Sequence, residues 1–119
     1  MSRAAGRRRL AVVALLLALV AAAAASAEPR LIELTIKNGQ VPEGQRLLKV
    51  TQGDDVTLRW TTDRPLTVHV HGYDLETKLA PGAPVSVRFT ARATGRFAIE
   101  VHGDRGEARP LAYLEVHPR

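Results

Sequence analysis

Short runs in which apolar and polar residues alternate follow one another along most of the chain. Because successive side chains of a strand point to opposite faces of its sheet, each run predicts a strand with one buried face. Beyond residue 27, no segment repeats apolar residues at helical spacing over three turns. The pattern therefore predicts an all-β protein with about seven strands. The predicted strands are 32–36, 46–50, 56–60, 67–71, 85–89, 95–101 and 112–116.

Glycine, proline, aspartate and asparagine separate these runs. Asn38-Gly39, Gly53-Asp54, Pro81-Gly82 and Thr94-Gly95 all stand between predicted strands. Glycine tolerates positive φ and proline fixes φ, so such pairs favour tight reversals. We therefore predict one domain, an all-β sandwich or barrel, with polar residues such as Arg59 and Arg88 on its outer faces.

Histidines stand at strand spacing in two of the predicted strands. In His69-Val70-His71 and in Glu100-Val101-His102, the outer two residues share one face and the valine takes the other. If the two strands are neighbours, three imidazoles and a carboxylate can meet. Imidazole is a common ligand of copper and zinc, and cupric ion favours tetragonal nitrogen and oxygen sets. The predicted metal ligands are His69, His71, His102 and Glu100, with copper expected before zinc.

The alternative is that these histidines are solvated or hydrogen-bonded on a sandwich face and bind no metal. The fourth histidine, His117, stands near the end of the sequence and is left out of the predicted site. Gly72-Tyr73-Asp74 follows the first triplet and is interpreted as a bulge or turn in which Tyr73 covers the core edge. Its other interpretation makes Asp74 an acceptor for a histidine N–H.

The first 27 residues predict a cleaved signal peptide. Four arginines precede the apolar run 10–25, and Ala25-Ser26-Ala27 has the small-x-small pattern of a cleavage site. The apolar run has 16 residues and is rich in alanine, whereas a membrane-spanning helix needs about 20 residues. We expect residues 28–119 to form one periplasmic or secreted domain that does not span a membrane.

Charge and composition exclude several classes of protein. Residues 28–119 carry 13 Lys and Arg against 12 Asp and Glu, a net charge of +1, so the basic balance of the whole chain does not indicate nucleic-acid binding. No cysteine is present, which excludes disulfides, thiolate ligands and a cysteine nucleophile. Ser86, the only serine after residue 27, lies mid-strand without a glycine elbow, so we do not expect an enzyme. Asp54-Asp55 lacks the loop spacing of calcium sites and is expected to be a solvated turn.

The order of these signals resembles the cupredoxin-like domains, especially the short exported bacterial ones. The resemblance is carried by residues 53–60, His69, Pro81-Gly82 and residues 94–102, and it spans most of residues 40–117. It implies a single Greek-key β-sandwich whose fourth and seventh strands lie side by side and antiparallel. That arrangement would place His102 opposite or diagonal to His69, and Glu100 near His71.

The sequence departs from the family's metal site. In this family a blue copper ion is held by a histidine at the start of the fourth strand, and by a cysteine, a histidine and usually a methionine around the loop after the seventh. His69 falls at the first of these positions, but the cysteine position falls on Val101. The loop 103–110 contains neither histidine nor methionine, and the only methionine is Met1. A blue electron-transfer site needs the copper–thiolate bond and is therefore excluded.

These observations lead to two functional hypotheses. The first is a monomeric periplasmic carrier or chaperone that binds copper, or zinc, through His69, His71, His102 and Glu100. The second is a metal-free module that binds a partner protein in the cell envelope.

Overall fold

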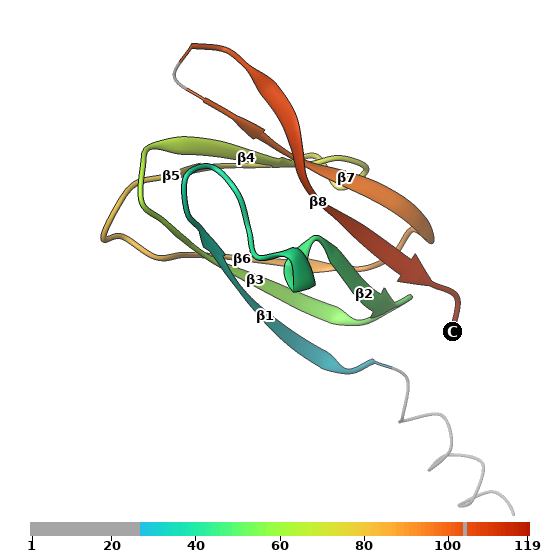
Figure 1. Ribbon diagram of the computed structural model, residues 1–119. Coiled ribbons are helices and arrows are strands. Elements are labelled where there is room, and N and C mark those ends of the chain that lie inside the picture. The colour runs from blue at the N-terminus through green and yellow to red at the C-terminus, as the bar shows by residue number, and fades with distance from the viewer. Residues whose placement is uncertain (1–26, 104) are drawn as a thin grey trace, which may run out of the picture.

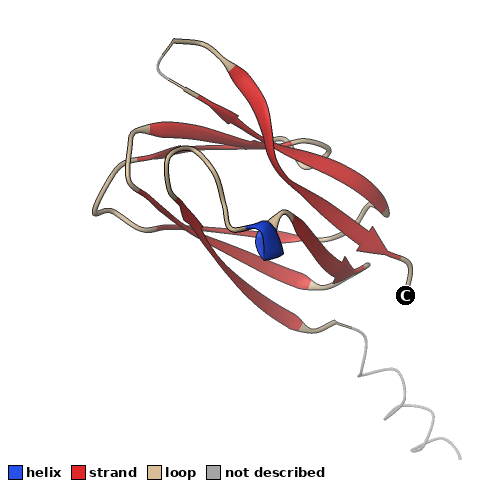
Figure 2. Cartoon of the chain, viewed as in Figure 1, coloured by secondary structure: helices blue, strands red, loops and turns tan. Residues whose placement is uncertain are grey.

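The computed structural model describes residues 27–103 and 105–119, which form two packed β-sheets (Figures 1 and 2). The predicted signal segment lies outside the described residues except for Ala27. The helix η1 spans Glu43–Gln45, and no helix in the described part of the chain is long and apolar enough to cross a membrane. The strands are β1 (Pro29–Ile36), β2 (Leu47–Thr51), β3 (Asp55–Thr62), β4 (Leu66–Val70), β5 (Leu75–Leu79), β6 (Val85–Thr90), β7 (Gly95–His102) and β8 (Ala108–His117).

Three strands form one sheet and five form the other. The smaller sheet has the order β1-β3-β6, and the larger has the order β2-β8-β7-β4-β5. β1 runs parallel to β3 and β2 runs parallel to β8, whereas the remaining neighbours are antiparallel. Figure 1 shows the two sheets as stacked layers, so the all-β sandwich predicted from alternation is confirmed.

The core lies between the sheets and follows the predicted alternation. In β3, Val56, Leu58 and Trp60 are buried, and across the sandwich Ile99 and Leu114 are fully buried. Removing this apolar surface from water is the main favourable term for a domain without disulfides. The alternation also forces the intervening residues of β4 and β7 to the outer face of the larger sheet, which is what positions the candidate site.

Residues 27–103 and 105–119 form eight strands where about seven were predicted. The additional strand, β5, pairs antiparallel with β4 along its whole length. Its sequence, Leu75-Glu76-Thr77-Lys78-Leu79, alternates as expected for a strand. The strand was not predicted because it is short and directly follows the turn at residues 71–74. β5 forms one edge of the larger sheet and places further polar residues beside the histidines.

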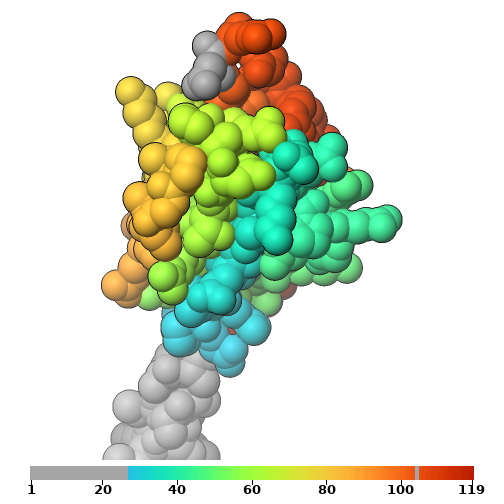
Figure 3. Space-filling model, turned by 60° about the vertical axis from the view of Figure 1, so that its left-hand side comes forward, coloured from blue at the N-terminus to red at the C-terminus, as the bar shows by residue number. Residues whose placement is uncertain are grey.

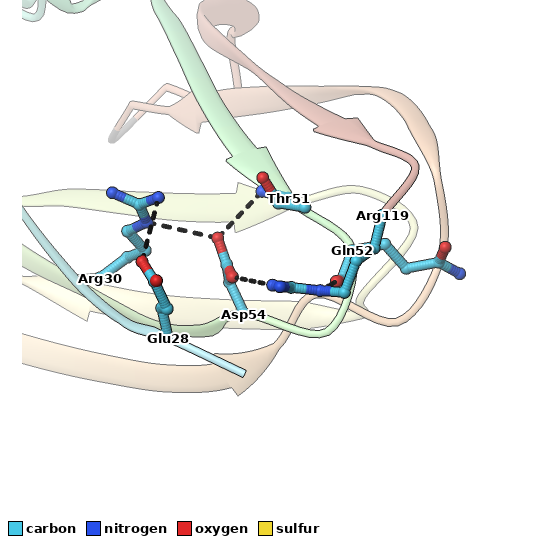
Figure 4. Close-up of polar contacts among 6 residues, drawn as sticks. All are labelled: Glu28, Arg30, Thr51, Gln52, Asp54 and Arg119. Atoms are coloured by element: carbon cyan, nitrogen blue, oxygen red, sulfur yellow. Dashed lines mark hydrogen bonds and ion pairs between the residues drawn. The ribbon is translucent and has the colours of Figure 1, made fainter. Parts of the chain in front are cut away.

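Asp54 is buried, and the predicted solvated turn at this position is wrong. Its side chain accepts hydrogen bonds from the Thr51 backbone N–H (2.9 Å), from Arg30 (3.3 Å) and from Arg119 (2.7 Å), as Figure 4 shows. These contacts join β1, the turn between β2 and β3, and the residue at position 119. A buried carboxylate is tolerated because several donors replace its water shell.

Candidate metal centre

The predicted pairing of the two histidine-bearing segments is present. β4 and β7 are antiparallel neighbours, with His69 opposite Glu100 and Thr67 opposite His102. His71 lies just beyond β4, where its backbone N–H donates to Ala98 O at 3.0 Å and so continues the pairing. Because Val68, Val70 and Val101 are buried, the four candidate ligands lie together on the outer face of the larger sheet. Of these, His102 is diagonal to His69.

Glu100 lies between two imidazoles. Its Oε2 is 3.0 Å from His71 Nε2 and 3.7 Å from His102 Nε2. The His71 contact meets the distance of a hydrogen bond but not its geometry, and Nε2 is itself buried without a hydrogen-bond partner. His71 Nε2 and Glu100 Oε2 are therefore two potential ligand atoms that lie close together and make no hydrogen bond to each other, so they could coordinate a cation.

The carboxylate is held in its charged form. The contact with His71 lowers the pKa of Glu100 most, and the positive charges of His71, His102 and His69 add to it against the opposing effect of desolvation. Lowering the pKa of a carboxyl keeps it ionised under mildly acidic conditions. The site therefore has one permanent negative charge next to its imidazoles at neutral pH.

His69 completes the cluster on the side toward β5. Its ring centroid is 4.4 Å from that of His71 and 6.4 Å from that of His102. Its Nε2 lies 3.9 Å from Asp74 Oδ1, which is fully exposed and too distant for a hydrogen bond. Asp74 is therefore near His69, as one interpretation of the turn proposed, but it does not fix the tautomer of that imidazole.

The turn after β4 is also a structural element. Tyr73 is partly buried against the core, and its hydroxyl donates to Ala93 O at 2.8 Å. Its ring contacts Phe89 and Phe97, with centroid distances of 4.8 and 5.2 Å. Tyr73 thus covers the core edge as predicted, and it anchors the turn that follows His71.

Glu76 was missed by sequence reasoning. It lies on β5 directly opposite His69, so it shares the outer face with the candidate ligands. The alternation of residues 75–79 could have revealed it, since that pattern predicts a strand with Glu76 facing outward. With Glu100 and Asp74, it gives the neighbourhood three carboxylates, which favours a cation.

The side chains as placed do not form a complete site. Among the described residues, no group of three or more His, Cys, Asp or Glu side chains is spaced to hold a metal ion. The separations of 3.0 and 3.7 Å around Glu100 Oε2 nevertheless fit ligands that each lie about 2.0–2.2 Å from a shared ion.

A blue copper centre does not fit this chain. Val101, at the position implied for the cysteine, is 3% exposed and packs in the core. His117, the remaining histidine, lies on β8 with its Nε2 3.0 Å from Glu115 Oε1, apart from the cluster. Thiolate chemistry is absent because the sequence has no cysteine.

Comparisons with known proteins define the fold. No protein-family model matches the sequence, and no curated protein does. A heme-copper terminal oxidase aligns at 17% identity with a TM-score of 0.60, covering 74% of this chain and 65% of that one. A blue copper oxidase from Nitrosomonas europaea aligns at 22% identity with a TM-score of 0.59, covering 77% of this chain and 39% of that one.

A smaller protein has the same fold at similar length. A copper binding protein studied in its apo form aligns at 12% identity with a TM-score of 0.58, covering 73% of this chain and 86% of that one. The chain spans less than two thirds of the length of the two oxidases. Together with the two-sheet topology, these likenesses show that the chain has a cupredoxin-like fold, as its sequence resemblance implied.

Proposed function

We propose that this protein binds a copper ion, and zinc less strongly, through His69, His71, His102 and Glu100 on the outer face of the larger sheet. The observation that carries the proposal is the position of Glu100 Oε2 between the Nε2 atoms of His71 and His102. Cupric ion is preferred because it favours tetragonal nitrogen and oxygen ligands and stands highest among divalent ions in affinity for such sites.

The role proposed is a carrier or chaperone in the periplasm rather than an enzyme. The site is on an open sheet face, with side chains of His71 and His102 44% and 40% exposed. Exposed ligands allow a metal ion to be exchanged directly with a partner protein. The copper proteins of the same fold make copper a reasonable cargo, although their chemistry belongs to them.

Isothermal titration with Cu²⁺ and with Zn²⁺ tests the proposal. We expect one equivalent of Cu²⁺ to bind more tightly than Zn²⁺, and the variant with alanine at His69, His71 and His102 to lose that binding. His117→Ala is the matched control, because His117 also pairs with a glutamate on the same sheet face but lies outside the cluster. The copper adduct should lack the intense blue thiolate band.

Two results would contradict the proposal. One is binding of both ions no tighter than tens of micromolar, which the scattered histidines of any surface can supply. The other is equal loss of binding in the triple variant and in His117→Ala. Either would favour the metal-free interaction module, and retention of envelope partners by the triple variant in a pull-down would then support that hypothesis.

A further inference from the structure

A second concentration of charged side chains lies at one end of the sandwich. The turn between β7 and β8, the link between β3 and β4, and the turn at residues 37–40 meet there (Figure 3, where the light green β3–β4 segment lies below the orange β7–β8 turn). They enclose a pocket of about 240 Å³. Its charged lining consists of Arg64, Arg105, Arg109 and Glu107, with Gly39 and Gly103 in its wall.

Among the described residues, the lining of the pocket carries a net positive charge. It has three cationic guanidinium groups against one described carboxylate, that of Glu107. Asp63 is a further carboxylate nearby, with Oδ1 3.5 Å from Arg64 Nε. Like charges gathered around a small concavity repel one another, and the concave shape concentrates their field on whatever enters it.

Two of the arginines are anchored rather than free in solvent. Arg109 donates from Nη2 to Gly39 O, and Arg64 donates from Nη2 to Asn38 Oδ1 at 3.0 Å. Gly39 has a φ of +71°, and a Cβ there would overlap the Arg109 guanidinium. The turn at Asn38-Gly39 is therefore shaped to let Arg109 approach its backbone closely.

Anchoring leaves most donors available. A guanidinium carries five N–H groups in a fixed planar fork, and these contacts use one or two in each of Arg64 and Arg109. The fork matches the paired oxygens of carboxylates and phosphates. The pocket is slightly smaller than the ~300–1,000 Å³ typical of sites for drug-sized ligands. A small oxyanion suits both its size and its charge.

We propose that this pocket binds a small soluble anion through carboxylate or phosphate oxygens, with Arg64 and Arg109 as the anchored contacts and Arg105 as the third. The proposal goes beyond metal binding and does not rest on it. The pocket adjoins the histidine face, since Val101 and Leu66 line it while their neighbours His102 and Thr67 face the sheet surface. None of the four candidate metal ligands lines it.

Thermal unfolding and isothermal titration with inorganic phosphate and with citrate test the proposal, because phosphate and carboxylate chemistry are then separated. Sodium chloride keeps the ionic strength constant across the titration, so that a change in the melting temperature cannot come from salt screening of surface charges. We expect at least one of the two anions to raise the melting temperature in a saturable way. Arg64→Gln and Arg109→Gln should each raise the dissociation constant about tenfold, as expected when a charge-assisted contact is lost.

Arg59→Gln is the matched control. Arg59 is 48% exposed, close to the 49% of Arg64, and pairs with Glu33 on the outer face of the smaller sheet, away from the pocket. Binding should be unchanged in this variant and in the triple histidine variant. No saturable effect of either anion, or an equal loss in Arg59→Gln, would overturn the proposal. Arg109→Gln could weaken the fold through the lost Gly39 contact, and circular dichroism of the variant detects such a loss. In that case the dissociation constant of Arg64→Gln alone decides the test.

Discussion

The Asp54 carboxylate is the one charged side chain that is fully buried among the described residues. Thr51, Arg30 and Arg119 donate to it, and both arginines are partly exposed. Asp54→Asn keeps the shape of the side chain but removes the charge that these donors stabilise. We expect it to lower the free energy of unfolding by about 2 kcal/mol, the scale of hydrogen bonds to a buried charge. Chemical denaturation at pH 7 measures this loss.

Asp55→Asn is the neighbouring control for that prediction. Asp55 pairs with Arg88, whose side chain is 74% exposed, so loss of that contact should matter much less.

The hydrogen bond from Thr51 lowers the pKa of Asp54 most, with Arg30 and Arg119 adding to it. A carboxyl whose folded pKa is depressed contributes stability above its ordinary pKa and loses it as pH falls through the lower folded value. The difference between wild type and Asp54→Asn should therefore shrink below about pH 3.8. A constant difference down to pH 2 would contradict this assignment.

Glu100 should show a similar dependence on pH. Its pKa is lowered by His71 first and then by the charges of His102 and His69. A carboxyl whose folded pKa is depressed contributes stability above its ordinary value, here 4.5, and loses it as pH falls through the lower folded value. We expect Glu100→Gln to destabilise the metal-free protein more at pH 5.5 than at pH 3. Urea denaturation at the two values measures it, and an equal loss at both would contradict the charge interaction.

At the scale of elements, the turn between β4 and β5 is conformationally constrained at Gly72, the residue after His71. Gly72 has a φ of +80°, and a Cβ on it would overlap the Phe97 ring. Gly72→Ala should therefore cost about 1–3 kcal/mol from backbone strain, with a steric term added. Gly82→Ala isolates the strain, because Gly82 has a φ of +74° and nothing within 4 Å of the added Cβ. Thermal unfolding should show the larger loss for Gly72→Ala, and equal losses would mean that the Phe97 ring yields freely.

The elements differ in how far the sequence predicted them. β3, β4 and β7 alternate cleanly, so their buried faces and the outward direction of the histidines followed from period two alone. β5 has the same pattern but only five residues beside a turn, which made it easy to take as loop. The pairing of β4 with β7 joins segments about thirty residues apart, so local pattern could not predict it and the family resemblance was needed.

The ion pairs of the buried Asp54 with Arg30 and Arg119 could not be predicted from the sequence either, because they also join distant segments of the chain. Arg119 reaches Asp54 across 65 positions of the chain, and Arg30 reaches it across 24. An Asp after Gly53 in a turn is normally solvated, and only the closing of the sandwich brings two arginines to it. Long-range polar contacts depend on the completed fold, whereas apolar alternation is local.

For the molecule as a whole, three charged features occupy separate places. The Asp54 cluster lies at the start of β3, the arginine pocket lies beyond the end of β3 at Arg64, and the histidines lie on the opposite sheet. Because they share no residue, changes at one should leave the others intact, and substitutions at separated, independent sites usually add. This separation is what allows the variants above to serve as one another's controls.

Metal binding should make the stability of the whole domain depend on pH. Histidine ligates only when deprotonated, so protons compete with the metal as pH falls through the imidazole range near 6.5. A ligand at 100 times its dissociation constant adds about 2.7 kcal/mol to the native state, which for a domain of this size raises the melting temperature by on the order of 10 °C. We expect Cu²⁺ to produce this rise at pH 7.5 and little at pH 5. The triple histidine variant should melt alike with and without copper at both values. An equally large rise at pH 5 would mean that carboxylates such as Glu76 and Asp74, rather than the imidazoles, dominate the metal ligands.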